Sequence, residues 1–172
     1  MIQFTKKSLP KKILDNLPLI LLFVSVLNEF DLNYLRIEYF SFNFVFTLIF
    51  YWTLKSPRYL SYGAIFVAGL INDVVMSFPL GISSLSYLIV CFFANYVRNK
   101  SVNTTIASDW FTFFLALIFA NLLFFLMLNK FSDLAISYSK ISYNTFFTLF
   151  LFPVFWLIFN IYQMNFIGGK DA

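Results

Sequence analysis

The sequence predicts an all-α, polytopic membrane protein whose six transmembrane helices form a single domain. The first observation is compositional: 60% of the 172 residues are hydrophobic, 23% are aromatic and only 12% are charged. An ordinary soluble domain carries about 25% charged residues, so too little polar surface remains here to cover a soluble fold. The other two observations are a series of six apolar segments and an uneven placement of basic residues between them.

Six segments approach the length of about 17–25 apolar residues that a transmembrane helix needs. We expect helices over about residues 13–32, 37–54, 59–78, 80–97, 108–128 and 141–164. The joint between the third and fourth helices, Ser77–Gly81, contains a proline and a glycine, the strongest breakers of local structure. We interpret this joint as a tight turn between antiparallel helices, and the alternative is one long helix.

The basic residues predict the orientation of the helices. Nine of the 12 lysines and arginines fall in the two chain tails and in the connections after the second and fourth helices. The remaining three fall in the connections after the first and fifth helices. Because cytoplasmic loops are enriched in lysine and arginine, we expect the nine-residue side, with both termini, in the cytoplasm. Termini on one side agree with an even number of spans.

The residue types exclude several kinds of chemistry. The chain has no histidine, and its one cysteine, Cys91, lies in an apolar run that predicts a small buried side chain. A Ser-His pair and a typical zinc site are therefore excluded. The glycines do not have the spacing of a phosphate-binding loop, and no two carboxylates fall close together in one span. We predict a protein that is not an enzyme, holds no metal or cofactor and binds no nucleic acid.

Asp73 is the only charged residue well inside an expected span. A carboxylate in hydrocarbon is costly, so such a residue faces the interior of the bundle. We favour a structural role, because no second ionisable residue in the spans completes a proton relay. The carboxylate would accept hydrogen bonds from Ser83, Ser84 or Ser86, or from backbone N–H groups freed at the turn. The alternative is a contact with a proton or a substrate.

Small residues line the third expected helix at spacings of three and four. This pattern lets helix backbones approach closely, and we expect it to serve packing within the chain rather than a subunit interface. The fourth helix contributes further small and polar residues, so the two helices form a tightly packed hairpin. The strip consists of Ser61, Ala64, Ala68 and Asn72, with Gly69 on the neighbouring stripe.

Bulky apolar residues dominate elsewhere. The outward faces of the second, fifth and sixth expected helices are dense in Phe, Leu and Ile, which suits either lipid or another membrane protein. Pro153 predicts a kink in the sixth helix, and Ser25, Asn121 and Asn160 are expected to form interhelical hydrogen bonds. Aromatic residues near the cytoplasmic helix ends resemble an interfacial belt, and these are Tyr51, Trp52, Tyr59, Tyr62, Tyr96, Trp110 and Tyr162.

The hairpin contains two short motifs, Gly69-Leu70-Ile71-Asn72-Asp73 and Ser77-Phe78-Pro79-Leu80-Gly81. They resemble the G-L-x-x-D stretch and the S-x-P-L-G turn of the MreD family of rod shape-determining membrane proteins. Phe78 departs from the pattern, because the family more often has a small residue there. The candidates for structural or partner contacts are Gly69, Asn72, Asp73, Pro79, Leu80 and Gly81.

This resemblance implies a non-catalytic scaffold of the bacterial cell-elongation machinery, located in the inner membrane. The implied direct partner is MreC, and MreB, RodA and a penicillin-binding transpeptidase belong to the same peptidoglycan-synthesising machinery. The implied fold is similar to the six-helix substrate-binding subunits of energy-coupling-factor vitamin transporters. Such a vitamin-binding subunit is the alternative function, although the first helix here lacks the A-x-x-x-A docking motif that those subunits carry.

Overall fold

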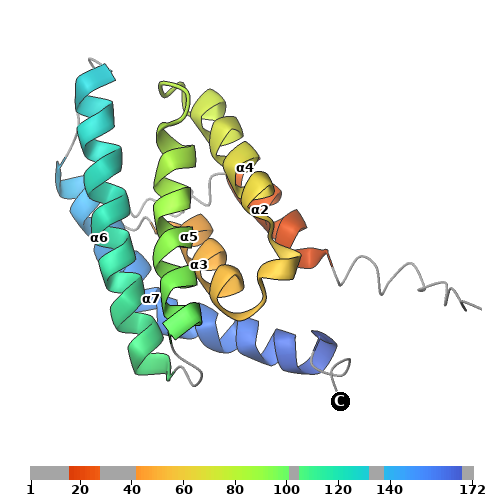
Figure 1. The fold of residues 1–172 in the computed structure, drawn as a ribbon. Helices are drawn as coiled ribbons and strands as arrows, with labels where there is room; N and C mark the ends of the chain where they lie inside the picture. The colour runs from red at the N-terminus through yellow and green to blue at the C-terminus, as the bar shows by residue number, and fades with distance from the viewer. Residues whose placement is uncertain (1–15, 28–41, 101–104, 132–137, 168–172) are drawn as a thin grey trace, which may run out of the picture.

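The computed structural model of the chain describes residues 16–27, 42–100, 105–131 and 138–167. Within these ranges the chain forms six α-helices and no strand, which confirms the all-α expectation (Figure 1). The π-helical turn η3 (Gln163–Ile167) follows the last helix, and the 3-10 turn η2 (Pro57–Tyr59) precedes the third. The helices are α2 (Leu17–Leu27), α3 (Phe44–Lys55), α4 (Tyr62–Val75), α5 (Ile82–Lys100), α6 (Ile106–Phe131) and α7 (Tyr138–Tyr162).

Local capping explains why several helices begin or end away from the expected positions. The second expected helix, 37–54, begins only at Phe44, because the Asn43 side chain accepts the Phe46 N–H at 3.1 Å and caps it. The third, 59–78, begins at Tyr62, after Ser61 accepts the Ala64 N–H at 3.3 Å. Residues 13–15, 28–32 and 37–41 of the expected spans lie outside the described residues.

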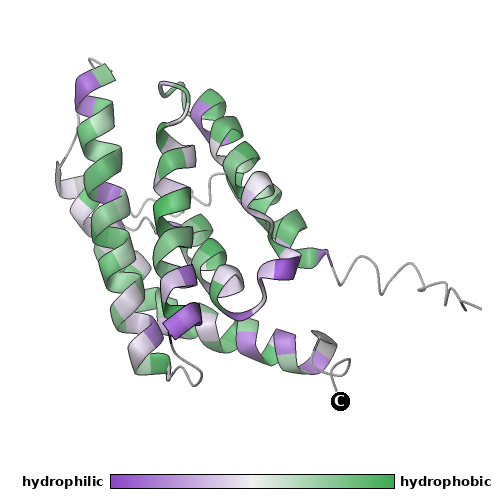
Figure 2. Cartoon of the chain, in the orientation of Figure 1, coloured by the Kyte–Doolittle hydropathy of each residue, from purple (hydrophilic) through white to green (hydrophobic). Residues whose placement is uncertain are grey.

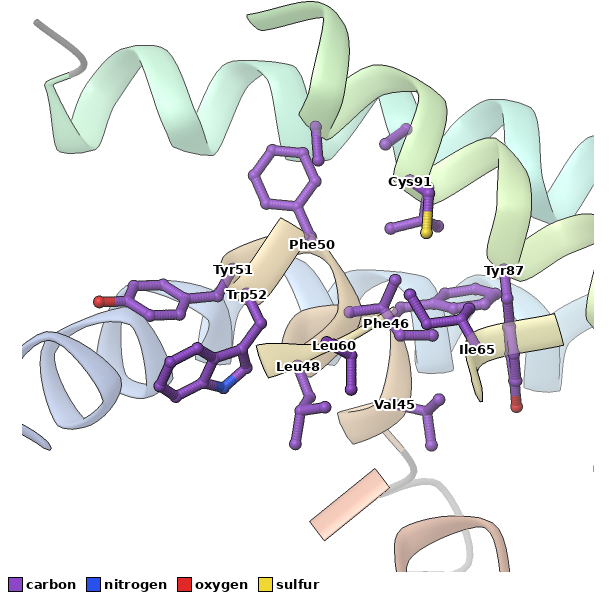
Figure 3. Packing of buried hydrophobic residues seen from close by; sticks show 14 of the residues in the cluster. Val45, Phe46, Leu48, Phe50, Tyr51, Trp52, Leu60, Ile65, Tyr87 and Cys91 are labelled. Atoms are coloured by element: carbon purple, nitrogen blue, oxygen red, sulfur yellow. The ribbon is translucent and has the colours of Figure 1, made fainter. Parts of the chain in front are cut away.

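Helix α3 forms the centre of the core. Its ten consecutive residues from Val45 to Leu54 are all buried, so this helix is enclosed on every side (Figure 3). The expectation of an outward face on the second helix is therefore wrong for α3. Tyr51 and Trp52 are also fully buried and do not belong to an interfacial belt, whereas Tyr62, Tyr96 and Trp110 are exposed. A helix that is apolar all round is buried by its neighbours, and sequence alone does not distinguish protein from lipid as the neighbour.

Helix α5 connects the two sides of the bundle. It packs against α3 and α4 on one side and against α6 on the other, while α7 crosses α3 and α6 obliquely (Figure 1). The turn between α4 and α5 lies at one end of the bundle, and the ends of α3 and α5 and the start of α6 lie at the other.

Apolar residues run along most of the helices, and hydrophilic ones gather at the lower end of α5 and around η2 (Figure 2). Two of the described helical segments, Ile106–Phe131 and Ile141–Asn165, are long and apolar enough to cross a membrane, whereas α2, α3 and α4 are shorter apolar helices. The outer faces of α6 and α7 expose large apolar side chains, including Phe111, Leu122, Leu126, Phe146, Phe150, Leu157 and Ile161.

Candidate functional site

The turn between α4 and α5 begins with a left-handed residue. Ser77 has φ 56°, a left-handed conformation that reverses the chain after a helix. Glycine is the residue usually found in this conformation at this position. The Phe78 N–H donates to the Asp73 carbonyl at 2.8 Å, and the Ser77 N–H donates to the Val74 carbonyl at 3.3 Å. These two bonds form a Schellman motif, which satisfies carbonyl groups at the end of α4.

Asp73 caps the helix that follows the turn. Its Oδ2 accepts the Gly81 N–H at 2.7 Å, and its Oδ1 accepts the Ser83 N–H at 2.9 Å. Gly81 has φ +100° and its carbonyl accepts the Leu85 N–H, so it occupies the position whose side chain normally caps a helix. Glycine has no side chain to do this, and Asp73 supplies the missing acceptor from α4. The negative charge also lies at the positive end of the α5 dipole.

Three further contacts hold α4 against α5. The Asn72 side-chain N–H donates to Ser83 Oγ at 2.9 Å, and Ser84 Oγ donates to the Phe66 carbonyl at 2.9 Å. Gly69 lies directly against Ser84, where an added Cβ would come within 2.6 Å of the Ser84 backbone nitrogen. Gly69, on the stripe beside the small-residue strip, therefore brings the backbones of α4 and α5 into contact.

The structure brings four of the six candidate residues into one cluster. Gly69, Asn72, Asp73 and Gly81 all lie where α4 meets the start of α5, as described above. Pro79 forms part of the turn, and Leu80 is 71% exposed beside it. Phe78 stands where the family pattern more often has a small residue, and its ring packs against Phe124 of α6 with ring centroids 5.4 Å apart. The hairpin is thus also fastened to α6, and Leu80 is the candidate that stands free for an outside contact.

A second buried carboxylate, which was not predicted from the sequence, lies at the opposite end of the bundle. Asp109, in the first turn of α6, is fully buried, and its Oδ2 lies 3.2 Å from Lys55 Nζ and accepts the Trp156 Nε1–H at 3.1 Å. Lys55 also lies 5.5 Å from the centre of the Trp156 ring. This cluster joins α3, α6 and α7. The sequence did carry a hint of this pair. A lysine at the end of one helix and an aspartate in the first turn of another are both stabilised by the helix dipoles.

Helix α7 is fastened to its neighbours by two more sets of polar contacts. Tyr51 Oη donates to Gln163 Oε1 at 2.9 Å, and Gln163 Nε2 donates to Ser56 Oγ at 3.0 Å. Near the middle of α7, Trp110 Nε1 donates to the Leu149 carbonyl at 3.0 Å. The start of α6 therefore contacts the middle of α7, and the end of α3 contacts the turn that follows α7.

The other polar expectations have mixed outcomes. Asn121 of α6 donates to Thr145 Oγ1 of α7 at 2.8 Å, which confirms an interhelical bond. Ser25 instead donates to the Leu21 carbonyl within α2, and Asn160 donates to Met164 Sδ, one turn further along the chain. Cys91 is buried and accepts a bond from Thr53 Oγ1 at 3.7 Å, as expected of a small core residue.

Comparison with protein families gives one match. The sequence model of a family described as rod shape-determining protein MreD matches residues 11–164 of the chain. Searches of the curated proteins and of the solved structures gave no match. The family match extends well beyond the hairpin pattern and takes in all the helices from α2 to α7.

Proposed function

The chain belongs to the MreD family of rod shape-determining membrane proteins, and from this premise we propose that it is a non-catalytic scaffold subunit of the bacterial cell-elongation machinery. In this proposal it binds MreC and helps to organise side-wall peptidoglycan synthesis together with MreB, RodA and a penicillin-binding transpeptidase. The observation that carries the proposal is the family match over residues 11–164.

The chemistry of the two buried carboxylates supports a scaffold over an enzyme. Both oxygens of Asp73 accept backbone N–H groups of the hairpin, so this carboxylate is engaged in holding two helices together. Asp109 is paired with Lys55 and bonded to Trp156, which joins three helices. Each carboxylate thus contributes to architecture, and both make contacts that a reacting group would have to give up.

We further propose six membrane spans in the inner membrane, with both termini in the cytoplasm and a fold related to the energy-coupling-factor substrate-binding subunits. The charges in the described helices support this orientation. Lys55, Arg98 and Lys100 lie in the last turns of α3 and α5. Arg98 Nη1 donates to the Thr53 carbonyl at 3.2 Å, so these helix ends lie together. Lys130, in the last turn of α6, lies at the other end.

The partner test is affinity purification of the tagged full chain in mild detergent, followed by mass spectrometry. We expect MreC as the main co-purifying protein, with RodA and a penicillin-binding transpeptidase at lower yield. A Leu80→Glu variant places a charge at the exposed tip of the hairpin. Comparing its co-purifying proteins with those of the parent tests whether a partner contacts that end. Recovery of an ATP-driven transporter module without MreC would replace the scaffold by the vitamin-transporter alternative.

A further inference from the structure

Helix α7 contains a built-in joint. Pro153 has no backbone N–H, so the Leu149 carbonyl, four residues earlier, lacks its usual helical donor. Trp110 of α6 supplies a donor instead, at 3.0 Å. Helices bend most readily where a proline interrupts the backbone ladder. The two halves of α7 are therefore connected less rigidly than a continuous helix would be.

The two halves are also fastened at different places. The first half is bonded to α6 through Asn121 and Thr145, and to the start of α3 through the Asn43 N–H and Thr148 Oγ1 at 2.7 Å. The polar contacts of the second half lie at the far end of the bundle, in the Lys55–Asp109–Trp156 cluster and at Gln163. Its Phe155 and Phe159 rings also pack against Phe44, so motion of the second half separates these rings but leaves the hydrogen bonds of the first half in place.

Two buried polar atoms beside the second half of α7 are unsatisfied. Asp109 Oδ1 and Trp52 Nε1 have no hydrogen-bond partner within the described ranges. Asp109 is bonded to Trp156, and the Trp52 ring packs against Phe159 and Tyr162 with centroids 6.3 and 6.2 Å apart. Both atoms thus belong to side chains that the second half of α7 contacts. A buried polar atom without a partner costs free energy, which is recovered when water reaches it.

We propose that the second half of α7, Val154–Tyr162, is a hinged arm that turns at Pro153 and is held closed by a latch made of Lys55, Asp109 and Trp156. Opening the arm hydrates Asp109 and Trp52, and it uncovers the side of α3 that carries the Tyr51 and Trp52 rings. The closed arm keeps the ion pair and the aromatic packing, while the open arm satisfies the two polar atoms. Each state thus keeps interactions that the other gives up, which is the property of a two-state conformational device.

The latch depends on charge balance, and this makes the proposal testable. Removing Lys55 alone leaves a buried carboxylate without its counter-ion, which strongly favours hydration and an open arm. Asp109→Asn removes the remaining charge but keeps an oxygen that accepts the Trp156 N–H, so the double variant avoids that penalty. Lys55→Met should therefore open the arm, and Lys55→Met combined with Asp109→Asn should close it again.

The test measures distances between spin labels by pulsed electron paramagnetic resonance, on the full chain in lipid nanodiscs with Cys91→Ser. One label pair, at Ile161 and Phe92, reports on the arm, and both side chains are well exposed. The control pair, at Phe146 and Phe92, reports on the first half of α7, since Phe146 is also exposed. We expect one narrow distance for each pair in the parent protein.

Lys55→Met should add a second, longer distance to the arm pair while leaving the control pair unchanged. The double variant should lose that second distance, and so should Lys55→Met combined with Pro153→Ala, which restores the missing backbone donor. An unchanged arm distance in Lys55→Met would overturn the proposal. So would a matching change in the control pair, because the whole bundle would then have loosened. Persistence of the second distance with Pro153→Ala would show that the joint is not at Pro153.

Discussion

Asp73 of α4 performs the capping that Gly81 cannot perform for its own helix. The Gly81 backbone has φ +100°, which favours glycine, and the Asp73 carboxylate reaches the Gly81 and Ser83 N–H groups at 2.7 and 2.9 Å. The Asp73 carbonyl thus helps to end α4, and the Asp73 side chain caps α5. The two residues form a single structural unit across the turn, and the stability of the hairpin should depend on both.

Substitutions at Asp73 should separate the charge from the hydrogen bonds. Asp73→Asn keeps one acceptor oxygen and should retain most of the folded protein and of its partner binding. Asp73→Leu leaves both N–H groups unpaired in a buried site, and each unpaired donor costs about 1–3 kcal/mol. We expect Asp73→Leu to lose most of the folded yield, measured by size-exclusion chromatography in detergent.

The control for this series is Val74→Leu, because Val74 is the next residue of α4 and is 66% exposed. This variant should elute like the parent protein. A well-folded Asp73→Asn variant that binds its partner but does not support rod shape would give the carboxylate a functional role in place of the structural one.

The close contact between α4 and α5 predicts opposite effects at two glycines. Gly69→Ala drives a Cβ to within 2.6 Å of the Ser84 backbone nitrogen, and neither backbone can move without disturbing the hairpin. Overpacking of this kind costs about 1–3 kcal/mol. Gly63→Ala meets nothing within 4 Å and should stabilise the helix by up to about 0.5 kcal/mol, because Gly63 is in its first turn. Thermal melting of both variants in the same detergent checks the prediction, and equal melting temperatures would contradict it.

Ser77 offers a stabilising substitution. A residue with a side chain pays roughly 1–2 kcal/mol for the left-handed conformation, which glycine adopts without that cost. Ser77→Gly should therefore raise the melting temperature, and Ser77→Val should lower it, because a β-branched residue fits this conformation worst. A Ser77→Gly variant that melts below the parent would mean that the Ser77 hydroxyl does more for the turn than its backbone costs.

The hairpin was predictable from sequence because its signals are local. A proline and a glycine close together indicate a turn, and an acid a few residues before it sits within reach of the next helix start. Small residues at spacings of three and four likewise indicate the face of α4 that packs closely, and Gly69 lies at that contact. Each inference needed only neighbouring residues and the geometry of a helix.

The environment of α3 and of Asp109 was not predictable in the same way. Tyr51 and Trp52 have the composition of an interfacial belt, yet they are buried because α7 crosses them. Asp109 and Lys55 are 54 positions apart in the sequence and meet only where the end of α3 and the start of α6 come together at one end of the bundle. Single-sequence reasoning assigns each helix a pattern but not the neighbours that enclose it.

The orientation proposed for the helices predicts which engineered cysteines are reached from outside the cell. In a Cys91→Ser background, Asn129→Cys at the end of α6 should react with an impermeant thiol reagent in intact cells. Asn99→Cys at the end of α5 should react only after permeabilisation. Both positions are exposed, so access to the reagent depends on the side of the membrane. Reaction of Asn99→Cys in intact cells would reverse the orientation.

The bond between Trp110 and the Leu149 carbonyl should matter only while Pro153 is present. Trp110→Phe keeps an aromatic ring but removes the N–H donor, which leaves the Leu149 carbonyl without this partner. In Pro153→Ala the new backbone N–H satisfies that carbonyl, so the indole donor becomes redundant. Interhelical hydrogen bonds in membrane proteins couple by about 0.6 kcal/mol on average, and we expect a coupling of that order here.

A double-mutant cycle of Trp110→Phe and Pro153→Ala, followed by reversible unfolding in mixed micelles, measures this coupling. Trp110→Phe should destabilise the parent protein but cost little in the Pro153→Ala background. Phe111→Leu provides the control, because Phe111 is the next residue of α6 and is 63% exposed, so its effect should simply add to that of Pro153→Ala. If the Trp110 and Pro153 substitutions were also additive, the indole would be packing against α7 without compensating for the proline.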